Sequence, residues 1–267
     1  MRACYREIRP SLRLARYVEC YWQRQEYSPI PDCRILPDGC VDILFSTLHG
    51  EPAGLTVTGL MTKPLVCDIE ADRWFFGVRF RPGMAAAFLP EAALLNDKVE
   101  PLENLCGAAA VRSIAGRLVE SANLHQMAEI MDGFLRPAEP PDSAQRALWN
   151  LSATSVSLDR LVSDAGLSPR HFRRACVQRL GVSPKYLRRL LRFRGAVEKI
   201  SAMSAAQPNW AHLAAACGYY DQAHFIREFQ EFAGCTPGRF LQSPDRGVGL
   251  ESNHHEPSQT RKSNRLH

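Results

Sequence analysis

The second half of the chain contains the same helical pattern twice. The first copy reads LDRLVSDAGLSPRHFRRACVQRLGVSPKYLRR from Leu158, and the second reads WAHLAAACGYYDQAHFIREFQEFAGCTPGRFLQ from Trp210. The His-Phe pair at 171–172 of the first copy matches the pair at 224–225 of the second. An internal repeat of this length marks a duplicated supersecondary unit, so this half must be built from two related helical pieces.

Each copy is predicted to form a helix, a tight turn and a second helix. In the first copy, Gly166 suits the left-handed conformation that ends a helix, and Ser168 followed by Pro169 is a strong start for the next one. Gly218 and Asp221 take these places in the second copy. The spacing also predicts the residues that the second helices bury: Phe172 and Ala175 or Cys176 in the first copy, and Phe225, Phe229 and Phe232 in the second.

The remaining side of each second helix carries long polar side chains. These are Arg170, Arg173, Arg174 and Gln178 in the first copy, and Gln222 and Arg227 in the second. A DNA major groove is about 12 Å wide and admits one helix, and there arginine suits guanine and glutamine suits adenine. We therefore predict that both second helices contact DNA, and that four of these side chains reach base edges: Arg170, Arg174, Gln222 and Arg227.

The charge of the chain is divided unevenly. Residues 1–143 hold 15 Lys/Arg and 19 Asp/Glu, a net charge of −4, whereas residues 144–267 hold 18 and 9, a net charge of +9. Such asymmetry indicates a polyanionic partner for the basic half. Basic helical faces are often merely solvated, but residues 144–199 carry 12 Lys/Arg against 3 Asp/Glu. This scarcity of acids favours a DNA-binding surface.

Residues 184–200, PKYLRRLLRFRGAVEKI, are predicted to form a helix that connects the two copies. A rigid helix would hold them at a fixed separation, and successive major-groove segments on one face of DNA lie about 34 Å apart. Its buried side would hold Tyr186, Leu187, Leu190, Leu191, Val197 and Ile200, and its basic side Arg188, Arg189, Arg192 and Arg194.

Together these features resemble the AraC/XylS family of bacterial transcription regulators, in which a long helix joins two helix-turn-helix units. The resemblance covers residues 144–242 and is carried by GYYDQAHFIREFQEFAGCTPGRF, with its glycine, Asp-Gln helix start, Phe-x-x-x-Phe pair and Gly-x-x-Pro ending. It implies two recognition helices, the first with Arg170, Arg173 and Arg174 and the second with Gln222, His224 and Arg227. The second copy departs in charge, because residues 200–242 have two basic residues and three acidic ones. We therefore expect the first unit to supply most of the attraction to phosphates and the second more of the base readout.

The N-terminal part has a different pattern of apolar and turn-forming residues. Residues 1–24 have a helix-like apolar spacing, and residues 34–80 resemble short strands separated by turns. Such strands favour a small antiparallel barrel or sandwich, and the family resemblance implies a cupin-like β-barrel followed by dimerising helices. We expect an α+β chain whose C-terminal domain is an all-α double helix-turn-helix. Further helices are predicted at 84–95, 108–121 and 124–135. The chain is predicted to divide into a sensor or dimerisation domain at 1–136, a Pro-rich linker at 136–143, a DNA-binding domain at 144–242 and a disordered tail at 243–267.

Three functions remain open for the N-terminal domain. It could bind a small organic effector through aromatic residues that equally suit a core, namely Trp22, Phe45, Trp74 and Phe76. It could be a thiol or metal sensor that uses Cys33, Cys40, Cys67 and His49. It could instead pair two chains through apolar helix positions that equally suit packing within one chain, namely Ile114, Leu118, Leu124, Met127, Ile130, Met131 and Leu135.

Sequence motifs for catalysis are missing. The chain has no Gly-rich phosphate loop, no GxSxG and no HExxH, so we expect no enzymatic activity, no cofactor and no metal. A cysteine-dependent enzyme fused to a DNA-binding domain is the remaining enzymatic alternative. The nine cysteines form no CxxC, the N-terminal MRACYREIRP lacks the apolar core of a secretory leader, and no stretch reaches the ~18 apolar residues of a membrane span. These observations favour the cytoplasm, with double-stranded DNA as partner and RNA polymerase, a small-molecule effector and a second copy of the chain as further candidates.

Overall fold

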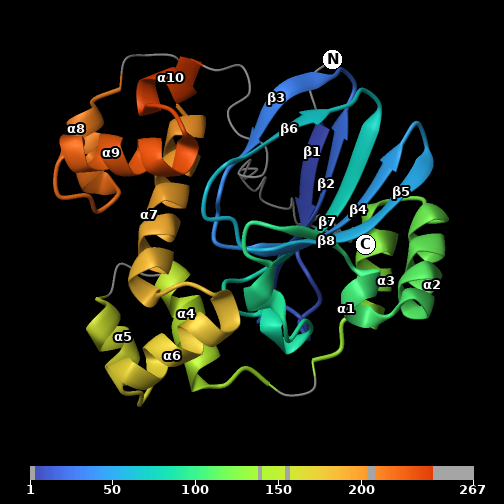
Figure 1. The fold of residues 1–267 in the computed structure, drawn as a ribbon, viewed down its shortest axis with the longest axis horizontal. Helices are drawn as coiled ribbons and strands as arrows, with labels where there is room; N and C mark the ends of the chain where they lie inside the picture. Colours follow the sequence, from blue (N-terminus) through green and yellow to red (C-terminus); the bar gives the residue numbers. More distant parts are fainter. Residues whose placement is uncertain (1–3, 138–139, 154–156, 204–207, 243–267) are drawn as a thin grey trace, which may run out of the picture.

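The computed structural model describes residues 4–137, 140–153, 157–203 and 208–242. Figure 1 shows one part made of strands with short helices, and a helical part in which the long helix α7 runs between two groups of helices. A β-rich domain followed by a helical domain confirms the expected α+β class. None of the helices within the described ranges combines the length and the apolar character that crossing a membrane requires. The predicted tail, 243–267, lies outside the described residues.

Six strands of the N-terminal domain form one antiparallel sheet in the order β1-β2-β7-β4-β5-β8, and β3 pairs with β6 in a separate ribbon. Within the described residues these pairings do not close into a barrel, so the expected cupin-like barrel is not found. Local texture predicts strands, but it does not determine which strand edges meet. The bounds are β1 Cys4–Ile8, β2 Val18–Glu26, β3 Ile30–Ile35, β4 Val41–Leu48, β5 Glu51–Thr58, β6 Leu65–Ile69, β7 Arg73–Phe80 and β8 Val99–Pro101.

The strands between residues 34 and 80 form where the turn residues predict them. The Pro-Asp-Gly turn before β4 places Gly39 at φ +84°, a conformation that glycine adopts without steric cost. Strand β7 ends at Phe80, directly before the Arg-Pro-Gly turn. Alternation along β4 and β7 then buries one row of apolar side chains that includes Ile43, Phe45, Phe76 and Val78.

Residues 1–24 contain two strands, so the helix predicted there is wrong. Strand β2 buries Tyr21 and Trp22 side by side, and neighbouring side chains of a strand point to opposite faces, so both faces of β2 are covered. Leu12 lies between β1 and β2 and is 96% exposed. Because apolar residues on both faces of a strand can mimic a helical period over a short window, spacing alone gave the wrong element here.

The segment 84–95 forms two short 3-10 turns in place of the predicted helix. These turns, η1 (Ala85–Ala87) and η2 (Ala92–Leu95), lie on either side of Pro90. Proline lacks the amide hydrogen and clashes with the preceding helical turn, which explains the break. The other two predicted helices are present as α2 (Ala108–Val119) and α3 (Leu124–Phe134), preceded by the short α1 (Glu103–Cys106).

Helices α2 and α3 pack against the sheet. Tyr21 of β2 donates a hydrogen bond to the Asp132 carboxylate of α3 at 2.5 Å. Of the seven apolar residues considered for a seam between two chains, six are buried within this chain and Ile130 is partly buried. Packing within one chain therefore accounts for their spacing.

The helical domain contains two pairs of helices, each pair with a tight turn between its members. Helices α5 and α6 form the first unit, α8 and α9 form the second unit, and α7 connects them. The bounds are α4 Ser143–Ala153, α5 Leu158–Asp164, α6 Pro169–Leu180, α7 Pro184–Ser201, α8 Trp210–Ala216, α9 Gln222–Ala233 and α10 Pro237–Gln242.

The predicted linker, 136–143, is held at its C-terminal end. Asp142 accepts a hydrogen bond from the Gln145 amide of α4 at 2.8 Å and pairs with Arg179 of α6 at 2.5 Å. Residues 138–139 lie outside the described part. The segment just before α4 is thus attached to the helical domain.

The N-terminal domain packs against α7. Arg194 of α7 pairs with Glu19 of β2 and donates a hydrogen bond to the buried thiol of Cys40 at 3.4 Å. Burial alone would raise the pKa of Glu19, but Arg194 lowers it below its usual value. Nearby, Gly39 lies so close to α7 that an added Cβ would come within 3.3 Å of Leu191. An ion pair and an apolar contact thus fix α7 on this domain.

The same domain reaches the end of each unit's second helix. Asn96 donates a hydrogen bond to the carbonyl oxygen of Leu180, the last residue of α6, at 2.8 Å. Arg34 donates one to the carbonyl oxygen of Ala233, the last residue of α9, at 3.1 Å. Leu180 and Ala233 occupy equivalent positions in the two copies. The N-terminal domain therefore contacts both units at the same structural position.

Candidate nucleic-acid interface

The first unit forms as the sequence predicts. The turn after α5 places Gly166 at φ +68°, and Ser168 caps α6 by accepting a hydrogen bond from the His171 amide at 3.2 Å. Helix α6 buries Phe172 and Cys176. This core determines which side of α6 faces outward.

All four residues predicted for the outer side of α6 are exposed, namely Arg170, Arg173, Arg174 and Gln178. None of them forms a hydrogen bond or ion pair through its side chain within the described part of the chain. Arg170 and Arg174 are four residues apart and therefore lie on the same side of the helix. Three guanidinium groups without acidic partners suit phosphates and guanine edges.

The second unit repeats this geometry. Gly218 has φ +75°, and Asp221 caps α9 by accepting a hydrogen bond from the His224 amide at 2.6 Å. Gln222 and Arg227 are exposed, without side-chain partners among the described residues. The two helices that the sequence predicts for DNA contact therefore both present polar side chains to solvent.

His224 lies differently from the other predicted contact residues. Its Nε2 is 3.6 Å from a carboxylate oxygen of Glu228, and its ring packs edge-on against Tyr219 with centroids 5.4 Å apart. The side chain is 34% exposed. The imidazole is therefore directed at its own unit, and it is less available to DNA than Gln222 or Arg227.

A buried carboxylate joins the second unit to α7. Glu228 of α9 is 3% exposed and binds Arg189 at 2.8 Å and Arg192 at 2.7 Å. Arg189 also pairs with Glu231 at 2.5 Å. Partial burial alone would lower the pKa of Arg189, but its hydrogen bonds to the two glutamates raise it above its usual value. This ionic cluster fixes the orientation of α9 on the connecting helix.

The predicted basic side of α7 is therefore mostly neutralised. Arg189 and Arg192 bind acids of α9, and Arg194 binds Glu19 of the N-terminal domain. The predicted basic side therefore does not act as one cationic surface, because the elements that pack on α7 bring acids to these three arginines. Arg188 is exposed and has no side-chain partner within the described ranges.

The roles of two residues of the second unit, Glu228 and Tyr220, were not predicted from the sequence. Glu228 falls among Phe225 and Phe229 on the apolar side of the helix, and a carboxylate buried there requires cationic partners. The position of a glutamate among apolar residues could therefore have indicated a buried ion pair. Tyr220 stands immediately before the cap Asp221 and is 93% exposed, which places an aromatic ring beside the N-terminus of α9.

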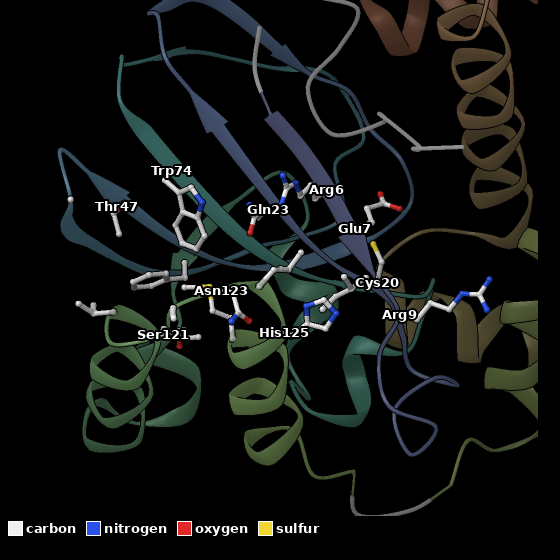
Figure 2. Close-up of a pocket in the computed structure, with 18 of the residues that line it drawn as sticks. Arg6, Glu7, Arg9, Cys20, Gln23, Thr47, Trp74, Ser121, Asn123 and His125 are labelled. Carbon is white, nitrogen blue, oxygen red and sulfur yellow. The ribbon is translucent and has the colours of Figure 1, made fainter. Parts of the chain in front are cut away.

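The aromatic residues proposed for an effector site separate into two groups. Phe45 and Trp74 line a cavity of about 1350 Å³ between the sheet and the connection from α2 to α3 (Figure 2). Trp22 lies on the other face of the sheet and donates a hydrogen bond to Asp42 at 3.1 Å. Phe76 is fully buried in the core. Half of the predicted set thus borders a cavity.

The cysteines proposed for a sensor are also divided. Cys33 and Cys67 are directly opposite each other in the β3–β6 ribbon, whereas Cys40 lies beside Arg194 at the domain interface. Across the described residues, no three His, Cys, Asp or Glu side chains gather as a metal ion would need. The structure therefore offers no support for a metal site built from these cysteines and His49.

Comparison with known families gives one match for each domain. Residues 161–243 match a family described as a helix-turn-helix domain, and residues 6–100 match one described as a domain of unknown function (DUF6597). The first match begins inside α5 and spans both second helices and α7. No curated protein matches the chain.

Solved structures also resemble the chain. The C-terminal domain of AraT, a response regulator from Geobacillus stearothermophilus, is 22% identical over 43% of this chain and 95% of that chain, with a TM-score of 0.35. ToxT from Vibrio cholerae O395 is 9% identical over 83% of this chain and 95% of its own, with a TM-score of 0.41. A DNA-binding transcriptional dual regulator from Escherichia coli K-12 is 23% identical over 38% and 97%, with a TM-score of 0.32.

Proposed function

The chain carries a DNA-binding helix-turn-helix domain of the AraC/XylS family of transcription regulators, and from this premise we propose that both of its units bind promoter DNA. In this proposal α6 and α9 enter adjacent segments of the major groove. Helix α7, fixed to both units, sets the distance between them. The protein would then recognise a composite site longer than one unit could cover.

One observation carries this proposal: α6 presents three exposed arginines with no acidic partner among the described residues. Two arginines of α7, Arg189 and Arg192, are by contrast paired with Glu228. Unpaired guanidinium groups on an outward helix can neutralise phosphates and donate two hydrogen bonds to guanine. Arg170, Arg174, Gln222 and Arg227 are the side chains that we propose for base edges.

The N-terminal domain would regulate how the two units are presented. It contacts α6, α7 and α9 through Asn96, Glu19 and Arg34, so a change in this domain can alter the geometry of the units. A small effector or pairing with a second chain would supply that change. RNA polymerase remains a candidate partner of the DNA-bound state.

The test is a salt-dependent binding measurement on a site obtained by mapping bound genomic DNA. Fluorescence anisotropy of the full chain should show a loss of affinity of about 10³-fold or more between 50 and 200 mM salt, because several phosphate contacts release counterions. Replacing both Arg170 and Arg174 by Ala should lower affinity and reduce the salt slope by about 2. The matched control is Arg160→Ala, since Arg160 is an exposed arginine of α5 that pairs with Asp164. Binding that ignores salt, or equal losses in the control, would contradict the proposal.

A thiol-responsive regulator is a second candidate, because Cys33 and Cys67 face each other in the ribbon that carries Arg34. Opposite residues of antiparallel strands have Cα atoms about 4.5–5.5 Å apart, within the range of a disulfide. Oxidation by hydrogen peroxide would form the S–S bond and break the O–O bond, and the two thiol protons and two electrons would reduce the peroxide to two molecules of water. Loss of two titratable thiols after peroxide, abolished by Cys33→Ser, together with changed DNA affinity, would support this candidate. Unchanged thiol counts would exclude it.

A further inference from the structure

Four strands of the N-terminal sheet place polar side chains on one face. Arg6 of β1 is opposite Gln23 of β2, and Trp74 of β7 is opposite Thr47 of β4. Gln23 is opposite Phe76, which lies two residues from Trp74, so all four side chains share one side of the sheet. Arg6, Gln23, Trp74 and Thr47 belong to the face that also bears Tyr21, the residue that contacts α3.

Helices α2 and α3 cover only one part of this face. Tyr21 is covered and hydrogen-bonded to Asp132, whereas the part with Trp74, Gln23 and Arg6 borders the cavity of about 1350 Å³. Figure 2 shows these side chains above the residues that connect the two helices, with His125 on the opposite wall. The cavity exists because the sheet extends beyond its helical cover.

The cavity is lined by both aromatic and polar side chains. Phe45 is 1% exposed and forms an edge-to-face pair with Trp74 at 6.2 Å, which gives a fixed aromatic wall. The side chains of Gln23, Trp74 and Arg6 form no hydrogen bond within the described residues, so their donors are available to a bound molecule. An aromatic wall beside polar groups that lack protein partners is a combination found in small-molecule sites.

The charge that remains for a ligand is positive. Two carboxylates line the cavity, but Glu19 pairs with Arg194, and Glu7, which follows Arg6 on β1, points to the opposite face of the sheet, where Tyr5 donates it a hydrogen bond at 2.5 Å. Arg6 is exposed and has no acidic partner among the described residues; Arg9 and His125 also line the cavity. A guanidinium binds carboxylate, sulfonate and phosphate groups through paired hydrogen bonds.

We propose that this cavity binds a small molecule with a flat aromatic body and an anionic group. The aromatic body would pack on Trp74, which Phe45 supports from the buried side, and Arg6 would bind the anion. Glu19, which also lines the cavity, pairs with Arg194 of α7, so the site is joined directly to the helix that connects the two units. The role of this ligand as a regulatory effector rests on the proposed function, but its binding does not.

The test uses two dyes of nearly the same shape with the full chain and no DNA. The anionic probe is 8-anilinonaphthalene-1-sulfonate and the uncharged one is N-phenyl-1-naphthylamine, and fluorescence titrations give both affinities. We expect Arg6→Gln to weaken binding of the anionic dye about 5- to 10-fold, as loss of a charge-assisted hydrogen bond implies, and to leave the uncharged dye unaffected. Trp74→Leu should weaken both.

The matched control is Arg112→Gln, which removes an exposed arginine of α2 that does not line the cavity. It should leave both affinities unchanged. No saturable binding of the anionic dye, or the same affinity in Arg6→Gln as in the natural chain, would overturn the proposal. Circular dichroism melts of all variants check that they remain folded. Because DNA is absent, failure here leaves DNA binding by α6 and α9 standing, and failure of DNA binding leaves these titrations intact.

Discussion

The two units, α5–α6 and α8–α9, share one arrangement of helices but present different charges. Arg174 of α6 and Arg227 of α9 occupy equivalent positions, and both are exposed. Beside Arg174 stand two further arginines, whereas α9 has Ala223 and Ile226 at the corresponding positions. The same backbone thus offers three cations in one unit and one in the other, which would separate attraction to phosphates from base recognition.

On the buried sides, the second unit is the more charged of the two. Helix α9 buries Glu228, which binds Arg189 and Arg192 of α7, and helix α6 buries Ala175 at the equivalent position. The first unit is therefore attached to α7 by apolar packing, and the second by ion pairs as well. The comparison teaches that a duplicated unit can exchange a methyl group for a carboxylate when the connecting helix supplies cations.

The largest effect is expected when the buried carboxylate is removed. Glu228→Ala should lower the free energy of unfolding by about 2–3 kcal/mol, because it leaves two guanidinium groups without their partner. The cost is placed below that of a fully buried pair because Arg189 and Arg192 are 28% and 25% exposed and can still reach water. Urea unfolding followed by circular dichroism measures the change.

Glu231→Ala is the matched control for this variant. Glu231 pairs with Arg189 but is 53% exposed, so its loss should cost less than about 1 kcal/mol. Ala175→Gly in the first unit removes a buried methyl group and lowers helix propensity, and should cost about 1–2 kcal/mol. If Glu228→Ala proved no more costly than Glu231→Ala, the ionic attachment of the second unit would be refuted.

The next effect compares the two equivalent arginines in DNA binding. Arg174→Ala should cost about 2 kcal/mol of binding free energy and lower the salt slope by about 1. Arg227→Ala should cost a similar amount of binding free energy on the best site. On unrelated DNA it should cost less, because binding there depends on attraction to phosphates, to which the second unit with its fewer cations contributes less. Anisotropy titrations at several salt concentrations measure both quantities. Equal losses and equal slope changes on specific and unrelated DNA would remove the proposed division between the units.

The outward sides of α6 and α9 could be predicted because their determinants are local. Ser168 and Asp221 start the helices, and the apolar spacing sets which side is buried. The same applies to β7, which ends at its turn as expected. Where both faces of a strand are covered, as at Tyr21 and Trp22, the spacing of apolar residues is ambiguous, and it led to the prediction of a helix in place of β2.

Pairings between distant residues could not be predicted from spacing. Arg189 and Glu228 are 39 residues apart, and the arginine resembles a solvated side chain until α9 packs on α7. The strand order could not be predicted for the same reason, because nothing in the sequence of β2 alone indicates that β7 will be its neighbour. The cavity at Trp74 follows from that order, so the sequence could suggest its aromatic residues but not its walls.

A smaller effect is expected at the start of α9. Gln222→Ala should reduce discrimination at one base pair by about 1–2 kcal/mol and leave the salt slope unchanged, because an uncharged side chain releases no counterions. Gln230→Ala is the control, since Gln230 is exposed on the same helix near its C-terminal end. Binding to a set of single-base variants of the site shows the change. A lowered slope for Gln222→Ala, or the same loss on every base variant, would contradict base readout by this residue.

The smallest effect concerns the two hydrogen bonds from the N-terminal domain. Asn96 binds the end of α6 and Arg34 binds the end of α9 at equivalent carbonyls, and each bond should contribute about 1 kcal/mol. Asn96→Ala should therefore increase hydrogen exchange about 5-fold in the last turn of α6 and leave α9 unchanged, while Arg34→Ala should do the reverse. If either variant increased exchange in both helices equally, the units would respond as one body, and the N-terminal domain could not adjust them separately. If each variant affects its own helix, a change in this domain can alter one unit while the ion pairs of Glu228 keep the other in place.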